Sequence, residues 1–164
     1  MGELQRYMDT QATQAAAREL QLKQMEHEAR VRSQERVREF VEEATRRNLG
    51  KAALYLERSI IRPKKGPVSI RYAQNDVTYN YTYLDSGWVI PDGDESGPDN
   101  KIILPNSDVY TCTVPPYGLK APKEFTRLPY VTTSVNEHES PTPLPSPFSG
   151  EAGLHLLASA LQRR

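Results

Sequence analysis

The sequence has few of the residues on which several classes of protein depend. Its 164 residues include a single cysteine, Cys112, so no disulfide can form within the chain and a reducing compartment is expected. No apolar run is long enough for a transmembrane helix, and the first residues contain no apolar signal core, so we expect a cytoplasmic protein. Lys and Arg number 21, as do Asp and Glu, so no overall positive charge attracts nucleic acid or an anionic membrane.

The sequence also lacks the arrangements of side chains that catalysis and metal binding require. It contains no Gly-x-Ser-x-Gly motif, no glycine-rich phosphate loop and no paired carboxylates in a catalytic context. His27, His138 and His155 do not have the spacing of a zinc site. Residues 92–97 begin like an EF-hand calcium loop, but Ile103 occupies the position that needs a bidentate Glu. We therefore expect no enzyme activity, no metal and no cofactor.

Proline and glycine are absent from residues 3–49, and all 13 prolines come later in the chain. Ala, Gln, Glu, Arg and Leu dominate the first fifty residues, and several Glu side chains precede a basic residue by four positions. This composition predicts one long charged helix over residues 1–50. Gly50 is expected to occupy the position just after its last turn, where glycine is favoured.

The apolar residues of this helix form a thin stripe along one face. The stripe consists of Leu4, Tyr7, Met8, Ala15, Leu22, Met25, Ala29, Phe40 and Ala44. It is interrupted between Arg32 and Arg36, and its long spacings fit a straight helix better than the seven-residue repeat of a left-handed coiled coil. Two interpretations stay open: a solvated helix or imperfect coiled coil, and a straight helix that lies along a partner. A self-contained bundle is disfavoured because no second long helix is present.

The next segment is apolar and then strongly charged. Residues 51–62 carry several Leu, Ile and Ala side chains before Pro63 and predict a short second helix. Residues 51–75 carry six basic side chains and one acidic side chain, whereas residues 76–100 carry six acidic and no basic ones. The basic connector at 63–67 is either a solvated linker or a contact with an acidic surface.

Alternating residues predict a β-hairpin within residues 63–91. Its first strand carries Val68, Ile70 and Tyr72 on one face, and its second strand carries Val77, Tyr79, Tyr81 and Tyr83. The tyrosine face serves either as packing core or as an interface. Residues 101–114 contain candidate short strands, with Cys112 as a small buried side chain, and the hairpin needs such neighbours because an isolated hairpin is only marginally stable.

The last two segments are each predicted to bind a surface outside themselves. Residues 92–149 contain ten prolines and scattered apolar side chains, which is typical of an extended chain that orders on a partner. Residues 150–164 predict an amphipathic helix with Ser149 as its N-cap. A helix this short needs a docking surface, either residues 51–114 of its own chain or another subunit.

These features predict a mostly α protein with a small β portion that is non-globular overall. We interpret the chain as a non-catalytic structural subunit that staples neighbouring protein subunits of a large assembly, with a cytoskeletal or ciliary, microtubule-associated lattice favoured by architectural analogy. The alternatives are a small virion or phage protein that forms a homo-oligomer through residues 1–50, and an accessory subunit of an organellar or ribonucleoprotein complex. The candidate partner-binding residues are Leu4, Leu22, Met25, Ala29, Phe40, Tyr79, Tyr81, Tyr83, Tyr117, Phe125, Tyr130, Leu154, Leu157 and Leu161.

Overall fold

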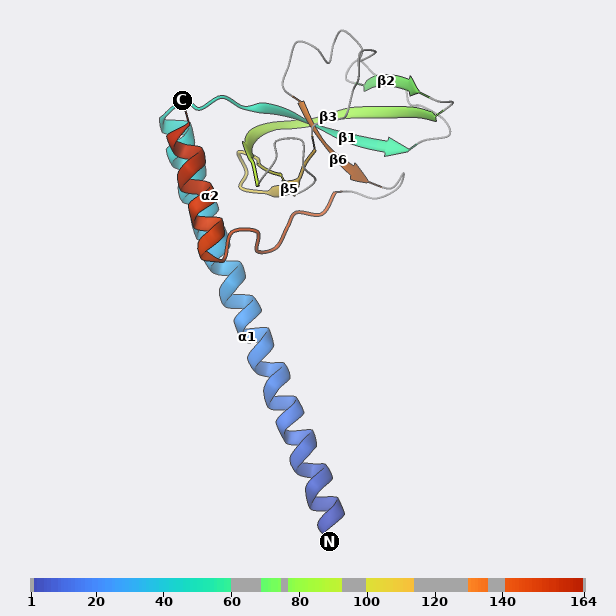
Figure 1. Cartoon of the computed structure of the whole chain (residues 1–164), viewed down its shortest axis with the longest axis vertical. Helices are drawn as coiled ribbons and strands as arrows, with labels where there is room; N and C mark the ends of the chain where they lie inside the picture. Colours follow the sequence, from blue (N-terminus) through green and yellow to red (C-terminus); the bar gives the residue numbers. More distant parts are fainter. Residues whose placement is uncertain are drawn as a thin grey trace.

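The fold is known from a computed structural model, which describes residues 2–59, 69–74, 77–92, 100–113, 130–135 and 141–163. Its elements follow in the order α1 (Glu3–Arg46), β1 (Ala52–Ser59), β2 (Ser69–Gln74), β3 (Val77–Ile90), β4 (Lys101–Ile103), β5 (Val109–Thr111), β6 (Tyr130–Val135) and α2 (Glu151–Gln162). The strands and α2 form a head, and α1 extends away from it with the N-terminus at the far end (Figure 1). The expected combination of a long N-terminal helix, β structure and a short C-terminal helix is confirmed.

α1 is a single helix of 44 residues, as the absence of Pro and Gly predicts. It ends in a Schellman motif, in which the Leu49 N–H donates to the Ala44 carbonyl at 3.0 Å and the Asn48 N–H to the Thr45 carbonyl at 3.1 Å. Asn48 has a left-handed backbone conformation, with φ of 52°. The expectation that Gly50 occupies this position is wrong, because Asn tolerates the conformation and ends the helix two residues earlier.

The prediction of a second helix over residues 51–62 is also wrong. Ala52–Ser59 form strand β1, and residues 60–62 lie outside the described residues. Leu54 is 0% and Leu56 is 5% exposed, whereas Tyr55 between them is only partly buried. This alternation has the period of a strand, in which successive side chains point to opposite faces. Good helix formers at several positions hid the alternation in the sequence.

β3 is the central strand of the sheet. β1 pairs with it antiparallel along one side, from Ala52 opposite Gly87 to Ser59 opposite Tyr79. On the other side, β2 pairs with the first half of β3, and β4 pairs with its last three residues, 88–90. β5 follows β4 and β6 lies beyond β1, which gives the order β5-β4-β3-β1-β6 with β2 beside β3. The antiparallel pairing of β2 with β3 is the hairpin that the alternating residues predict.

β6 corrects the view that residues 92–149 contain strands only at 101–114. Residues Tyr130–Val135 pair parallel with residues 53–58 of β1. The β-branched Val and Thr residues of this segment suit a strand, but a parallel pair between distant segments has no local sequence signature. Residues 93–99, 114–129 and 136–140 lie outside the described residues, so the extended course of that part of the segment stays a prediction.

Two apolar clusters lie on opposite sides of the sheet around β4. Ile102 and Ile103 are both 0% exposed and belong to different clusters, because neighbouring strand residues face opposite ways. The first cluster joins α1, the sheet and α2 and contains Val37, Phe40, Ala44, Trp88, Ile90, Ile103, Val109, Phe148 and Leu157. The second contains Leu54, Ile102, Leu104, Tyr110 and Cys112. The first cluster therefore fixes the direction in which α1 leaves the head.

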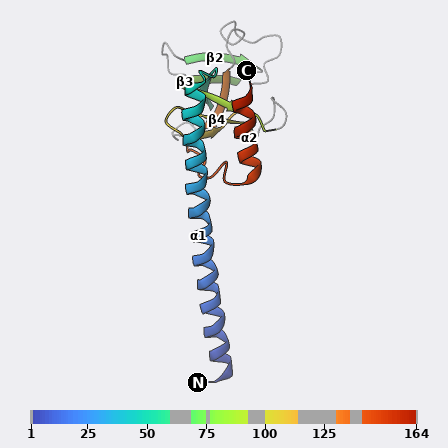
Figure 2. The same ribbon diagram turned by 90° about the vertical axis from the view of Figure 1, so that its left-hand side faces the viewer.

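α2 packs against the C-terminal part of α1 in its own chain, and the two helices run side by side (Figure 2). Leu157 is 4% exposed and is part of the first cluster. Of the two docking alternatives, the chain itself is the observed one, with α1 as the main surface in place of residues 51–114. Gly150 occupies the N-cap without a side-chain capping bond, and the Ser149 hydroxyl donates instead to the Ser146 carbonyl at 3.4 Å.

Candidate functional site

None of the residues that the structure describes buries the N-terminal part of α1. We call residues 3–29 the arm. Residues 2–28 are all exposed, and Figure 2 shows this part of the helix running clear of the head. Among its large apolar side chains, Leu4 is 73% exposed, and Leu22 and Met25 are each 59% exposed. Helix faces of this kind normally pack against another surface, since each such side chain gains about 1.5–3 kcal/mol on full burial.

The apolar stripe of the arm continues into the face of α1 that the head covers. At 3.6 residues per turn, Leu4, Leu22 and Met25 lie on the same side of the helix as the buried residues Val37 and Phe40. Leu20 and Val31, which are 61% and 39% exposed, lie on the opposite side. One helix face is thus covered by the protein itself in its C-terminal part and uncovered in its N-terminal part.

The change from uncovered to covered occurs at a segment that crosses α1, residues 141–149, which we call the strap. The backbone N–H of Phe148 donates to the Ser33 hydroxyl at 3.1 Å. The Arg36 guanidinium donates to the Phe148 carbonyl at 2.8 Å and to the Gly150 carbonyl at 2.7 Å. Phe148 itself is 0% exposed. The Ser33 and Arg36 side chains of α1 therefore anchor the strap through hydrogen bonds to the backbone of residues 148 and 150. The strap leads directly into α2.

The far end of α2 is attached to α1 by a second arginine. The Arg47 guanidinium donates to the Leu161 carbonyl at 3.0 Å, near the end of α2. Glu43 accepts hydrogen bonds from Arg46 at 2.6 Å and from Arg47 at 2.5 Å. Both hydrogen bonds hold the pKa of the Glu43 carboxyl at about 2, below its ordinary 4.5. Glu43 thus stays ionised near neutral pH and orients Arg47 toward α2.

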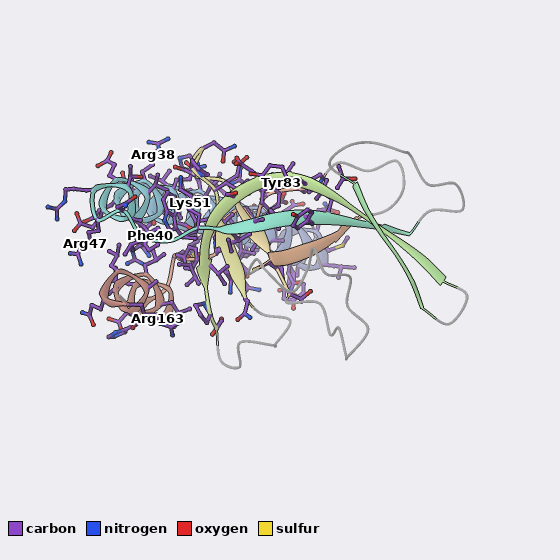
Figure 3. The ribbon with its side chains drawn as sticks, turned by 90° about the horizontal axis from the view of Figure 1, so that it is seen from above. Arg38, Phe40, Arg47, Lys51, Tyr83 and Arg163 are labelled. Carbon is purple, nitrogen blue, oxygen red and sulfur yellow. The ribbon has the colours of Figure 1, made fainter. Side chains whose placement is uncertain are left out.

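The structure separates the candidate partner-binding residues of α1 and α2 into two groups. Leu4, Leu22 and Met25 are exposed on the arm, and Ala29 is half-buried where the arm meets the strap. Phe40 is 2% exposed and packs edge-on against Trp88, with ring centroids 6.1 Å apart, so its assignment to a partner-binding surface is wrong. Figure 3 shows Phe40 where α1, α2 and the sheet meet.

The leucines of α2 and the aromatic candidates are distributed differently. Leu157 is buried, Leu161 is partly buried against the same cluster, and Leu154 is 48% exposed. Tyr83 is 38% exposed, its ring lies 5.8 Å from that of Tyr55, and its hydroxyl is 2.8 Å from the Ser86 hydroxyl. Tyr79, Tyr81 and Tyr130 lie in β3 and β6, but their side chains are outside the described residues, as are Tyr117 and Phe125 entirely. Leu157, like Phe40, serves the chain's own core and does not form a free surface.

Sequence reasoning missed the strap and its anchors. Ser33 and Arg36 stand in α1 like ordinary helical residues, and their partners are more than a hundred positions later in the chain. The break of the apolar stripe between Arg32 and Arg36 was the available signal. The sequence showed that the stripe stops there, and the structure shows that backbone carbonyls of residues 148 and 150 occupy that place.

The cysteine and histidine side chains, which in other proteins act as nucleophiles or metal ligands, are placed as follows. Cys112 is 1% exposed, and burial raises the pKa of its thiol to about 12, so it is protonated near neutral pH. His27 and His155 are exposed on different helices. In the part of the chain that the structure describes, no three His, Cys, Asp or Glu side chains are grouped as metal ligands would be. None of the described helices combines the length and apolar character needed to cross a membrane.

Among the described residues, two clefts border the covered part of α1. One of about 420 Å³ lies between α1 and the strap and is lined by Arg30, Gln34 and Asp108 together with prolines of the strap. Another of about 280 Å³ lies between α1 and α2 and has Phe40 and leucines of α2 in its wall. Both clefts result from contacts of α1 with the chain's own C-terminal region, and neither extends along the arm.

Comparisons of the chain with models of protein families, with curated proteins and with solved structures gave no match.

Proposed function

We propose that the protein is a non-catalytic structural subunit that joins neighbouring protein subunits of a larger assembly, with the arm as its main binding element. The observation that carries this proposal is the apolar face of α1, which the head covers from Ser33 onward and leaves in water from Leu4 to Met25. A folded head gains nothing in its own core from an uncovered extension of this length, whereas a second protein surface would bury the stripe.

The energetics of an isolated helix support the same proposal. Most helical stability in proteins comes from packing of the apolar face, and single helices are marginal in water. The arm spans about 40 Å at 1.5 Å per residue. It has the helix-forming composition needed to hold its shape, and five large apolar side chains on one side to give affinity for a partner. These side chains are Leu4, Tyr7, Met8, Leu22 and Met25.

The favoured setting is a cytoskeletal or ciliary lattice, in which a straight helix lies along a filament wall and the head occupies a neighbouring site. This choice rests on architectural analogy between a long straight helix and a filament surface. A second setting is a small virion or phage protein that forms a homo-oligomer. The observation that favours the second setting is the seven-residue spacing of apolar residues within the arm, such as Met8, Ala15, Leu22 and Ala29.

The test compares two variants of the tagged full-length chain, expressed in cells of its source and fractionated by size on a sucrose gradient. The first carries Leu4→Ser, Leu22→Ser and Met25→Ser on the stripe. The control carries Leu20→Ser, which removes an equally exposed leucine from the opposite face. We expect the wild type and the control to sediment with particles much larger than the chain, and the stripe variant to sediment as free protein. Equal sedimentation of all three would overturn the proposal.

A further inference from the structure

We propose that the arm binds the arm of a second copy of this chain, with the two helices antiparallel. This inference rests on the proposed function, in which the arm is a protein-binding element, and it names the partner. Three observations support it: a repeat confined to the arm, the position of α2 and the strap, and the sizes of the facing side chains.

The first observation is a seven-residue repeat that begins and ends with the uncovered part of α1. A first series at intervals of seven residues has the apolar Leu4 and Met25 at its ends and the polar Gln11 and Arg18 between them. A second series, four positions later, is apolar throughout and consists of Met8, Ala15, Leu22 and Ala29. The two series form one seam with alternating spacings of four and three. The next member of the second series is Arg36, which donates instead to the Phe148 carbonyl at 2.8 Å and to the Gly150 carbonyl at 2.7 Å. The repeat therefore ends where the chain's own contacts begin, and a seam of this kind is typical of pairing with another helix.

The second observation fixes the direction of the pair. From Ser33 to Ala44, the face of α1 that continues the seam is covered by the strap and α2 (Figure 2). Paired helices lie about 8–10 Å apart, so a parallel second copy in register would need the volume that α2 occupies. An antiparallel second arm meets no such obstacle among the described residues, which leave residues 2–28 of α1 exposed. When Leu4 faces the partner's Ala29, each arm covers the whole uncovered stripe of the other and stops one turn short of Ser33, with the heads at opposite ends.

The third observation concerns the sizes of the facing residues. In this register Leu4 faces the partner's Ala29, and Arg18 faces the partner's Ala15, so each alanine is opposite a long side chain. Met8 faces the partner's Met25, and Gln11 faces the partner's Leu22. The Arg18 stem can lie over the alanine methyl while its guanidinium stays in water. Parallel pairing in register would instead put the two Arg18 side chains in one layer and leave two layers made of alanine alone.

The test uses the purified full-length chain and engineered disulfides. Light scattering is expected to give twice the 18.6 kDa of one chain at micromolar concentration. Met8→Cys and Met25→Cys variants are then oxidised separately and as a mixture. Antiparallel pairing predicts covalent dimers mainly in the mixture, joining one chain of each variant. The native Cys112 is 1% exposed, so it does not compete for the engineered thiols.

Two control variants make the outcome decisive. Leu22→Ser with Met25→Ser should weaken the dimer by at least about tenfold in Kd, and Leu20→Ser should not. A monomer at these concentrations, or Met8→Cys chains that cross-link with themselves as well as in the mixture, would overturn the antiparallel pair. A monomer that still sediments with large particles through its stripe would leave the proposed function standing. A dimer that never joins a larger particle would leave the antiparallel pair standing and overturn the proposed function.

Discussion

The Ser33 hydroxyl in α1 accepts a hydrogen bond from the backbone N–H of Phe148 at 3.1 Å, and both residues are buried. The bond joins positions 115 apart in the chain and marks the point at which the head begins to cover α1. Serine is not a favoured residue in the middle of a helix. Here its hydroxyl accepts the hydrogen bond of the Phe148 N–H, which the strap brings into the core. A buried peptide N–H needs such a partner.

Replacing Ser33 with Ala tests this anchor. The Phe148 N–H would lose its partner, and we expect the free energy of unfolding to fall by about 1–3 kcal/mol. Urea unfolding followed by the fluorescence of Trp88, the one tryptophan of the sequence, measures the change. Glu35→Ala, at an exposed position two residues away, should stay within about 0.5 kcal/mol of wild type. Equal effects of the two substitutions would show that the anchor does not exist.

Gly153 in α2 offers a prediction whose sign is unusual. In the interior of a helix, Gly→Ala ordinarily stabilises by about 1 kcal/mol. A Cβ at residue 153 would lie only 2.6 Å from the Phe148 Cα, so we expect Gly153→Ala to destabilise by about 1–3 kcal/mol instead. Ser159→Ala, exposed on the same helix, should be neutral or slightly stabilising. Thermal unfolding of the two variants decides the matter, and a rise in Tm for Gly153→Ala would refute the close packing of the strap on α2.

Asn48 controls the end of α1. Its φ of 52° suits Gly and Asn but is strained for Ala, which should cost about 1–2 kcal/mol. Asn48→Gly should be neutral or slightly stabilising. Comparing the denaturation midpoints of the two variants checks both expectations. An alanine variant as stable as the glycine variant would mean that the helix ends elsewhere.

The pKa of the Cys112 thiol predicts a loss of stability at alkaline pH. Burial raises this pKa from 9.0 to about 12, so the unfolded chain releases the proton at lower pH than the folded chain does. The contribution is complete below pH 9 and is lost as the pH rises toward 12. Tyr55 and Tyr110, whose pKa values burial also raises, add to the loss above pH 10.

Urea unfolding of wild type and Cys112→Ala at two pH values isolates the thiol. The wild type should lose more free energy of unfolding than the variant as the pH is raised through the range between 9 and 12. The comparison removes the tyrosine contribution, which both proteins share. Parallel curves for the two proteins would show that the thiol is not buried in the folded state.

Local patterns predicted those elements whose signal lies within a few residues. The long helix follows from composition, and the β2–β3 pairing follows from alternation around a turn. The prediction of a helix over residues 51–62 is wrong because Ala, Leu and Glu favour a helix only locally. Ala52–Ser59 form a strand since they pair with β3 on one side and β6 on the other. β6 itself was missed because its partner is distant in sequence.

The candidate site was predictable only in part for the same reason. The stripe from Leu4 to Ala44 is readable in the sequence, but the sequence does not say which half the protein covers. Phe40 and Leu22 look equivalent on a helical wheel, yet Phe40 is 2% and Leu22 is 59% exposed. The difference arises from the strap and α2, whose contacts with Ser33, Arg36 and Arg47 link residues far apart in the chain.

The most direct test of the claim that the arm needs another protein surface is amide hydrogen exchange along α1. It is measured on the isolated chain over a range of concentrations. Helical segments without packing contacts open readily, whereas residues in a core exchange slowly. We predict slow exchange at residues 37–46 throughout, fast exchange in the arm at the lowest concentration, and arm protection that rises as the chain pairs. An arm as protected as residues 37–46 where the chain is monomeric would contradict the account.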